Sequence, residues 1–186
     1  APPGAADPAE VPAVAGRITS LAGRMRAAGP VMPGASRHVA GIVLTAMRRD
    51  PARRTAMALR FNEKTIAAGR ALGWRVGEFS RADEPPEVKA AEGSTLEWGT
   101  ARVIEQMGLV PDLIFDRGED GKEPVIRLLA ENPAQAVTGF DGLLFMIFST
   151  AFIGAVLALE AGPVSHYFIA QLRNCPLPSH WYLRTW

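Results

Sequence analysis

The segment 109–129, LVPDLIFDRGEDGKEPVIRLL, constrains the fold more than any other part of the chain. Leu113–Phe115 is a short apolar run of β-prone residues, which predicts a buried strand. Gly118 and Gly121 punctuate the polar stretch that follows, and glycine lets a backbone take positive φ or approach a ligand closely. Pro124 is typical of the first turn of a helix, where its missing N–H costs nothing. The segment therefore predicts a strand, a tight loop and a helix, as in a layered α/β domain.

The loop of this segment has two interpretations that the residues alone leave open. Backbone N–H groups, Lys122 and a helix N-terminus would together form a cradle for a phosphate or diphosphate. An ordinary tight turn between a strand and a helix fits the same residues. The spacing GxxGKE excludes a Walker A loop, because it is too short and lacks the Ser or Thr that holds magnesium. Three acidic residues around the loop could bind Mg²⁺ or could instead cap helices and form salt bridges: Asp116, Asp120 and Glu123.

The rest of the chain alternates helices and strands at intervals of roughly twenty residues, which again favours a layered α/β domain. A short helix is expected after Asp7, through Ala13, and either a pair of strands or an extended segment over 17–27. Further helices are expected over 37–49, 63–72, 84–91 and 95–107, with strands over 55–61 and 74–79. The helix over 95–107 is expected to begin with a capping box of Ser94 and Glu97.

Composition restricts the class of protein. The chain has 186 residues, 48% of them apolar, and a formal net charge of +1. One domain with a sizeable core is expected, and no electrostatic footprint for nucleic acid. The single cysteine, Cys175, excludes an internal disulfide and fits a reducing compartment, so a cytoplasmic location is expected. The first residues, APPGAADPAE, show no signal peptide.

The last fifty residues differ from the rest. Gly142–Leu159 is an uncharged apolar run of about the length that spans a bilayer, but neither flank has the Lys/Arg cluster that orients a membrane helix. Three interpretations stay open: an altered or fused gene end, which we favour, an apolar helix packed in the domain or in an oligomer, and a membrane anchor. We divide the chain into a domain over 1–135 and an unassigned segment over 136–186.

Few motifs for catalysis are present. The three histidines lack zinc-binding spacing, there are no CxxC pairs, and no GxSxG elbow occurs. His38, in the first turn of an expected helix, could donate a proton to an anion, or it could be an ordinary surface histidine. Arg17, after a glycine, could contact a phosphate or lie in solvent. Further candidates, each with an ordinary structural alternative, are Arg60, Arg81, Ser94, Trp98 and Arg117.

Six segments, in order, resemble the archaeal-type thiamine-phosphate synthase domain, which is often fused behind a hydroxymethylpyrimidine-phosphate kinase. They are PPGAADPAEVPAVAGRI, GASRHVAGIVLTAM with the DP after it, ALRFNEKTI, FSRADEPPEV, EGSTLEWGT and PDLIFDRGEDGKEPVIRLL. The resemblance covers residues 1–134. The family pattern has a strand before the motif with which this chain begins, so the domain is expected to be truncated there.

The resemblance implies a three-layer α/β/α fold of the class II aldolase-like type, with a mixed, mostly antiparallel sheet, commonly in a homo-oligomer. It implies condensation of hydroxymethylpyrimidine diphosphate with thiazole phosphate, assisted by Mg²⁺, to give thiamine phosphate and diphosphate. Arg17 and His38 match the two positions that the family uses for catalysis. The substrates and their phosphates would bind at Arg60, Arg81, Ser94, Trp98, Arg117, Gly118, Gly121 and Lys122, with Trp98 suited to stacking on a heteroaromatic ring.

A regulatory branch of the same family binds thiamine phosphate without turnover, carries a DNA-binding helix-turn-helix, and lacks the arginine and the histidine. This chain keeps both, so the enzyme is favoured over the regulator. A kinase or DNA-binding module preceding residue 1 is left open, as is an inactive fragment.

Overall fold

The computed structural model describes residues 1–21, 24–90 and 94–160. The chain divides into two compact units, Ala1–Leu144 and Phe145–Trp186. The first unit contains the sheet and the helices that surround it. The second unit begins within the long helix α5, Pro133–Glu160.

The first unit is built on a four-stranded sheet with the order β5-β8-β7-β6. Its strands are β5 (Thr55–Arg60), β6 (Val76–Glu78), β7 (Leu113–Asp116) and β8 (Val125–Ala130). β8 runs antiparallel to β5 and β7, while β6 runs parallel to β7. The sheet is therefore mixed and mostly antiparallel, as predicted.

The prediction of a helix opened by Pro124 is wrong, because β8 begins at the next residue. The Glu119 amide donates to the Lys122 carbonyl over 3.1 Å and the Lys122 amide to the Glu119 carbonyl over 2.8 Å, which closes a hairpin. Asp120 and Gly121 form its tip, and Asp-Gly between two apolar runs is a strong hairpin signal. Proline is tolerated just before a strand, so Pro124 was misleading.

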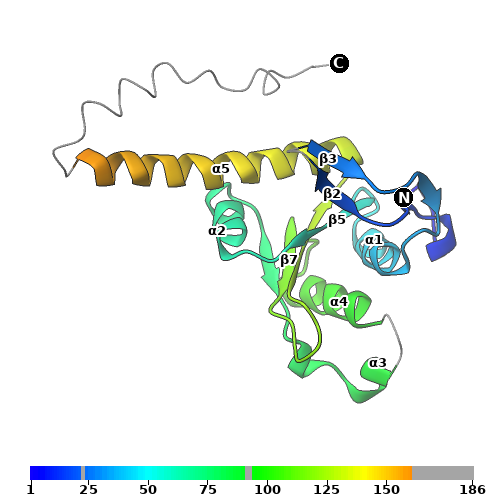
Figure 1. Ribbon diagram of the computed structural model, residues 1–186. Coiled ribbons are helices and arrows are strands. Elements are labelled where there is room, and N and C mark those ends of the chain that lie inside the picture. The colour runs from blue at the N-terminus through cyan, green and yellow to red at the C-terminus, as the bar shows by residue number, and fades with distance from the viewer. Residues whose placement is uncertain (22–23, 91–93, 161–186) are drawn as a thin grey trace. The chain divides into compact units, whose positions relative to one another are not determined.

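Helices cover both faces of the sheet (Figure 1). One face is covered by α1 (Arg37–Arg49) and α4 (Thr95–Met107), and the other by α2 (Glu63–Ala71) and the beginning of α5. The buried cluster on the α1/α4 face joins both helices to the sheet through Ile42, Phe79, Val103, Ile114 and Leu129. The first unit is thus a three-layer α/β/α structure.

Local signals in the sequence set most helix boundaries. Ser36 caps α1 by accepting a hydrogen bond from the Val39 amide over 3.4 Å. Gly108 ends α4 in the left-handed conformation, with φ of 68°. The capping box predicted at Ser94 is wrong: this residue has helical backbone angles, and its hydroxyl donates to the Val88 carbonyl over 2.6 Å.

The N-terminal region forms a β-ribbon. The predicted helix after Asp7 is shorter than expected, a 3-10 turn over Pro8–Glu10 called η1, because the chain continues as a strand. β1 (Pro12–Val14) pairs with β4 (Val31–Pro33), and β2 (Ile18–Leu21) pairs with β3 (Arg24–Ala27). Of the two alternatives predicted for 17–27, the structure forms the pair of strands.

Two short elements lie between β6 and α4 in the chain: the 3-10 turn η2 (Arg81–Asp83) and the helix α3 (Pro86–Ala90). Within the described part of the chain, no helix has both the length and the apolar character that a membrane crossing requires.

Candidate active site at the strand ends

Charged residues lie together at one edge of the sheet, because the strands that end there run in the same direction. β5, β6 and β7 are mutually parallel, so their C-terminal ends lie at the same edge. α1, α2 and α4 each precede one of these strands and run in the opposite direction to it. The N-termini of these helices therefore lie at the same edge. Gly41 near the start of α1 packs against Glu97 in the first turn of α4, as this arrangement requires. Helix N-termini carry partial positive charge and favour anions.

A buried carboxylate with two arginines lies at this edge, on the α1/α4 face. Asp116, the last residue of β7, is fully buried. Its Oδ1 accepts hydrogen bonds from Arg81 Nε over 2.6 Å and from the Gly118 amide over 2.9 Å, and its Oδ2 accepts from Arg127 Nη2 over 2.6 Å. Burial alone would raise the pKa of Asp116, but the hydrogen bond from Arg81 and the charge of Arg127 lower it below the ordinary value. Asp116 is therefore the counter-ion of two guanidinium groups.

Two buried charged residues were missed from the sequence: Arg127, which belongs to this cluster, and Glu84, which directly follows η2. Arg127 lies 5.2 Å above the ring of Phe79, and burial lowers the pKa of its guanidinium against the opposing effect of Asp116. Its Nε and Nη1 atoms are buried without a hydrogen-bond partner among the described residues, as are both carboxylate oxygens of Glu84. An arginine inside the apolar run VIRLLA was the available signal, because such residues are rarely buried unless paired.

Arg117 lies on the opposite face from its neighbour Asp116, because successive side chains of a strand alternate. It pairs with Glu63 at the start of α2 and, over 2.9 Å, with Glu78 of β6, and these hydrogen bonds raise its pKa. Its guanidinium carbon also lies 5.6 Å from the centre of the Phe115 ring. The structure therefore separates Arg117 from the Asp116 cluster, although the two are adjacent in sequence.

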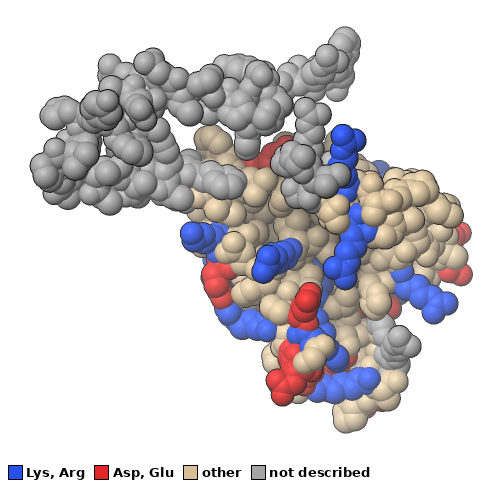
Figure 2. All heavy atoms as spheres, in the orientation of Figure 1, with Lys and Arg blue, Asp and Glu red and all other residues tan. Residues whose placement is uncertain are grey.

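The backbone amides of the hairpin after Arg117 donate hydrogen bonds within the hairpin itself. The amides of Gly118, Glu119 and Lys122 donate within the hairpin, and the element that follows them is the strand β8 and not the predicted helix. Gly118 and Gly121 both have positive φ, of 75° and 76°. Lys122 Nζ lies 3.9 Å from carboxylate oxygens of both Glu84 and Glu119. In the lower part of Figure 2, basic and acidic side chains lie next to one another, in keeping with such ion pairs.

The two residues matched to catalysis lie on different elements and are both exposed. His38 is the second residue of α1, at the edge just described. Arg17 lies on the β-ribbon, where its carbonyl accepts a hydrogen bond from the Ala28 amide over 2.8 Å. Arg60 ends β5 opposite Val125, which also pairs with Asp116, so Arg60 projects from the same face as the buried cluster.

Ser94 and Trp98 belong to the start of α4. The Ser94 hydroxyl connects this helix to α3 through the Val88 carbonyl. Trp98 is half-buried and meets Phe79 edge-on, with ring centres 5.9 Å apart. Because Phe79 also contacts Arg127, Trp98 is connected to the buried cluster through one ring.

The three acidic candidates do not form a magnesium site by themselves. Asp116 is fully engaged by two arginines and an amide, while Asp120 and Glu123 are exposed on the hairpin. Among the described residues, no group of three or more His, Cys, Asp and Glu side chains could hold a metal ion. The described part of the chain therefore does not fit a metal held by protein ligands alone.

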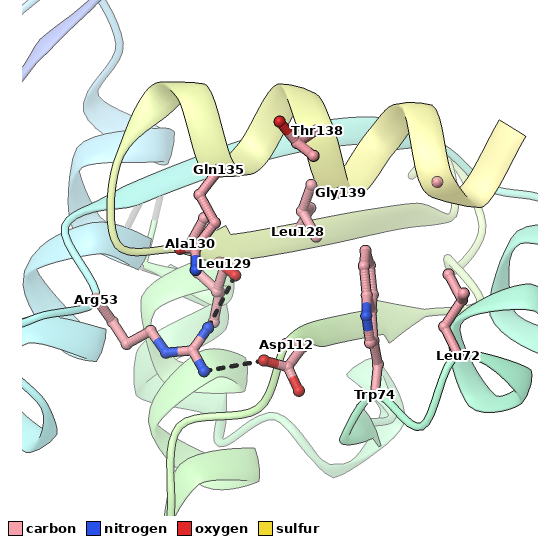
Figure 3. A pocket seen from close by; sticks show the side chains of 11 residues that line it. Arg53, Leu72, Trp74, Asp112, Leu128, Leu129, Ala130, Gln135, Thr138 and Gly139 are labelled. Carbon is pink, nitrogen blue, oxygen red and sulfur yellow. Dashed lines mark hydrogen bonds and ion pairs between the residues drawn. The ribbon is translucent and has the colours of Figure 1, made fainter. Parts of the chain in front are cut away.

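A separate cavity of about 340 Å³ lies on the other face, beneath the first turns of α5 (Figure 3). Arg53 crosses one side of it, donating to Asp112 over 2.9 Å and to the Leu129 carbonyl over 3.2 Å. Trp74 and Leu128 form an apolar wall. None of these residues was predicted as a site residue, because the cavity arises only where the first turns of α5 pack on the sheet.

Comparison with known proteins identifies the family. The family model described as "Thiamine-phosphate synthase ThiN" matches residues 1–140. This chain belongs to the ThiN family. It is 38% identical over 129 residues to the bifunctional thiamine biosynthesis protein ThiDN of Methanocaldococcus jannaschii, and 34% identical over 128 residues to the thiamine-phosphate synthase ThiN of Methanothermobacter thermautotrophicus. Each alignment covers 69% of this chain, but 30% of ThiDN and 67% of the synthase.

Two solved structures share the ThiN-family fold. The C-terminal domain of protein MJ0236 matches with a TM-score of 0.72 and 35% identity, covering 80% of this chain and 79% of that one. The C-terminal domain of a phosphomethylpyrimidine kinase matches with a TM-score of 0.64 and 37% identity, covering 70% and 73%. ThiN domains are thus found fused to a kinase in relatives of this chain.

Proposed function

We propose that the chain is a thiamine-phosphate synthase, a transferase that condenses hydroxymethylpyrimidine diphosphate with thiazole phosphate and releases diphosphate. The family match over residues 1–140 is the observation that carries this proposal. The matched span contains every motif on which the resemblance rests, together with the buried Asp116 cluster. The named synthase from Methanothermobacter thermautotrophicus supports the same activity.

The charge at the strand ends suits a substrate with two phosphates. The bond between the methylene carbon and the diphosphate oxygen breaks, and diphosphate leaves with the electron pair. The lone pair of the thiazole nitrogen then forms the new carbon–nitrogen bond. Groups that meet negative charge as it develops on diphosphate contribute most to such a step.

We assign diphosphate departure to Arg17 and His38, the residues matched to the catalytic positions. Phosphate binding is assigned to Arg60 and Lys122, which are both exposed. Arg81 donates a hydrogen bond to Asp116 and so connects η2 to the end of β7. Arg117 would reach a phosphate only from the α2 face, where it pairs with Glu63.

We propose that Mg²⁺ arrives bound to the diphosphate, because the described residues offer no cluster of ligands for it. Magnesium keeps several waters and is commonly held by one or two carboxylates together with substrate phosphates. The exposed carboxylates of Asp120 and Glu123 are available for that role. No step of the proposal depends on a metal held by the protein alone.

The assay is formation of thiamine phosphate from both substrates with Mg²⁺. We expect turnover by the wild type, and a loss of at least about 100-fold in kcat for Arg17→Ala and for His38→Ala, in the range typical of one proton donor or charge-stabilising group. Both side chains are exposed, so thermal unfolding should be unchanged. Absence of turnover together with tight binding of thiamine phosphate would instead indicate the regulatory class.

The proposal extends to partners and location. Relatives join this domain to a kinase, which favours a pathway in which the kinase supplies the diphosphate substrate. We also propose a homo-oligomer, which sedimentation would test, and a cytoplasmic location, which fits a chain with one cysteine.

A further inference from the structure

Glu84 is buried without a hydrogen bond, which sets it apart from the other charged residues of the site. It follows η2 directly, and its side chain is 0% exposed. Neither carboxylate oxygen has a hydrogen-bond partner among the described residues. Its nearest positive charge, Lys122 Nζ, lies 3.9 Å from Oε2, which is beyond hydrogen-bond distance.

Such a carboxylate is costly to keep. A buried ionised group without hydrogen bonds pays a large desolvation penalty, and native structures almost always satisfy these atoms. Asp116 shows how the same fold satisfies a buried carboxylate, with two arginines and an amide. The two free oxygens of Glu84 therefore indicate that a ligand supplies the missing donors.

The chemistry of the vacant acceptors specifies that ligand. An ionised carboxylate only accepts hydrogen bonds, and its two oxygens match a ligand edge that carries two adjacent N–H donors. An aminopyrimidine has such an edge when its ring nitrogen beside the amino group is protonated. Phe79, five residues before Glu84 in the chain, meets Trp98 of α4 edge-on, with ring centres 5.9 Å apart.

We propose that Glu84 binds the aminopyrimidine ring of the diphosphate substrate, and so selects that substrate; this inference rests on the proposed function. As the carbon–oxygen bond breaks, positive charge spreads from the methylene carbon into the ring and its amino group. A carboxylate hydrogen-bonded to that edge attracts the ring more strongly as this additional positive charge develops. Glu84 therefore contributes to the transition state as well as to binding.

The test is Glu84→Gln in the full chain, with Glu87→Gln as the matched control on the exposed surface of α3. We expect kcat/KM for hydroxymethylpyrimidine diphosphate to fall by about 10- to 100-fold, the range for one hydrogen bond to a charged group. The KM for thiazole phosphate should stay within about twofold of the wild type. Glu84→Asp, which keeps the charge but withdraws it by one methylene, should recover part of the loss.

A second measurement keeps this inference separate from the proposed activity. Calorimetry with hydroxymethylpyrimidine alone should show binding to the wild type and to Glu87→Gln, and at least about tenfold weaker binding to Glu84→Gln. That pattern would support the role of Glu84 even if no thiamine phosphate forms. Equal binding by the wild type and Glu84→Gln, or no binding by the wild type, would overturn it. A change in thermal stability with unchanged kinetics would assign Glu84 a structural role and overturn it as well.

Discussion

Replacing Asp116 by Asn tests whether this carboxylate holds the strand-end cluster together. The change keeps the shape of the side chain but removes the charge that faces Arg81 and Arg127. Both guanidinium groups are buried, with relative exposures of 8% and 1%, so neither can recover hydration without local unfolding. We therefore expect Asp116→Asn to be strongly destabilising.

The magnitude follows from the number of buried charges left unpaired. Removing one partner of a buried ion pair costs about 3–5 kcal/mol. Urea unfolding of the full chain, followed by circular dichroism, should show the midpoint lowered by roughly 1.5–2.5 M at an m value of about 2 kcal/mol/M. The melting temperature should fall by roughly 6–20 °C, taking about 2–4 °C per kcal/mol for a chain of this size.

Two comparisons make this prediction specific. In the wild type, Arg127 makes one hydrogen bond to Asp116, but its Nε and Nη1 atoms are buried without a partner among the described residues. Because Arg127→Met also removes these two unsatisfied nitrogens, it should lower the free energy of unfolding by about 2 kcal/mol less than Asp116→Asn does. Asp120→Asn, at the exposed hairpin tip, should stay within about 0.5 kcal/mol of the wild type. A loss below about 1 kcal/mol for Asp116→Asn, or a larger loss for Arg127→Met, would refute the assignment of Asp116 as the central counter-ion.

Three further predictions concern the same region. Gly118→Ala should lower the free energy of unfolding in urea by about 2–4 kcal/mol, because φ is 75° and a Cβ would lie 2.5 Å from the Lys122 carbonyl oxygen. Gly121 also has positive φ, but a Cβ there would meet open space, so Gly121→Ala should cost only about 1 kcal/mol. Equal losses for the two variants would contradict this reasoning. Gly99→Ala should cost about 1–3 kcal/mol by thermal melting, since a Cβ would lie 2.3 Å from the Phe79 ring, and an unchanged melt would disprove the close packing. Because the pKa of Asp116 is lowered in the folded state, its contribution to the free energy of unfolding is fully present above the ordinary pKa of 3.8 and is lost as pH falls through the lower native pKa. The wild type and Asp116→Asn should therefore converge in stability in acid. A difference in stability that stays constant with pH would argue against this assignment.

Local signals sufficed where one element determined the outcome. Ser36 and the apolar face after it predict α1 with the bounds that the structure has. Gly108 marks the end of α4, and the run after it marks β7. In each case the signal lies within one turn of the residue that it positions, so tertiary contacts were not needed.

The strand-end cluster depended on pairing that the sequence does not reveal. Lys122 and Pro124 resemble the entry to a helix, and only the partner strands β5 and β7 make the following run a strand. Arg127 was overlooked because its partner Asp116 reaches it across a strand pair. Asp116 was named as a metal candidate and Arg117 as a phosphate candidate, but the strand sends the two side chains to opposite faces.

This alternation along β7 determines where the chain can change in length. All four residues of Leu113–Asp116 are buried, so one inserted or deleted residue would turn every later side chain to the wrong face. Arg117 would then enter the α1/α4 layer, and the carboxylate would leave it. The tip at Asp120 and Gly121 is exposed, and added residues there would lengthen only the turn. Homologues should therefore vary in length at the tip, whereas the strand four residues earlier should keep its length.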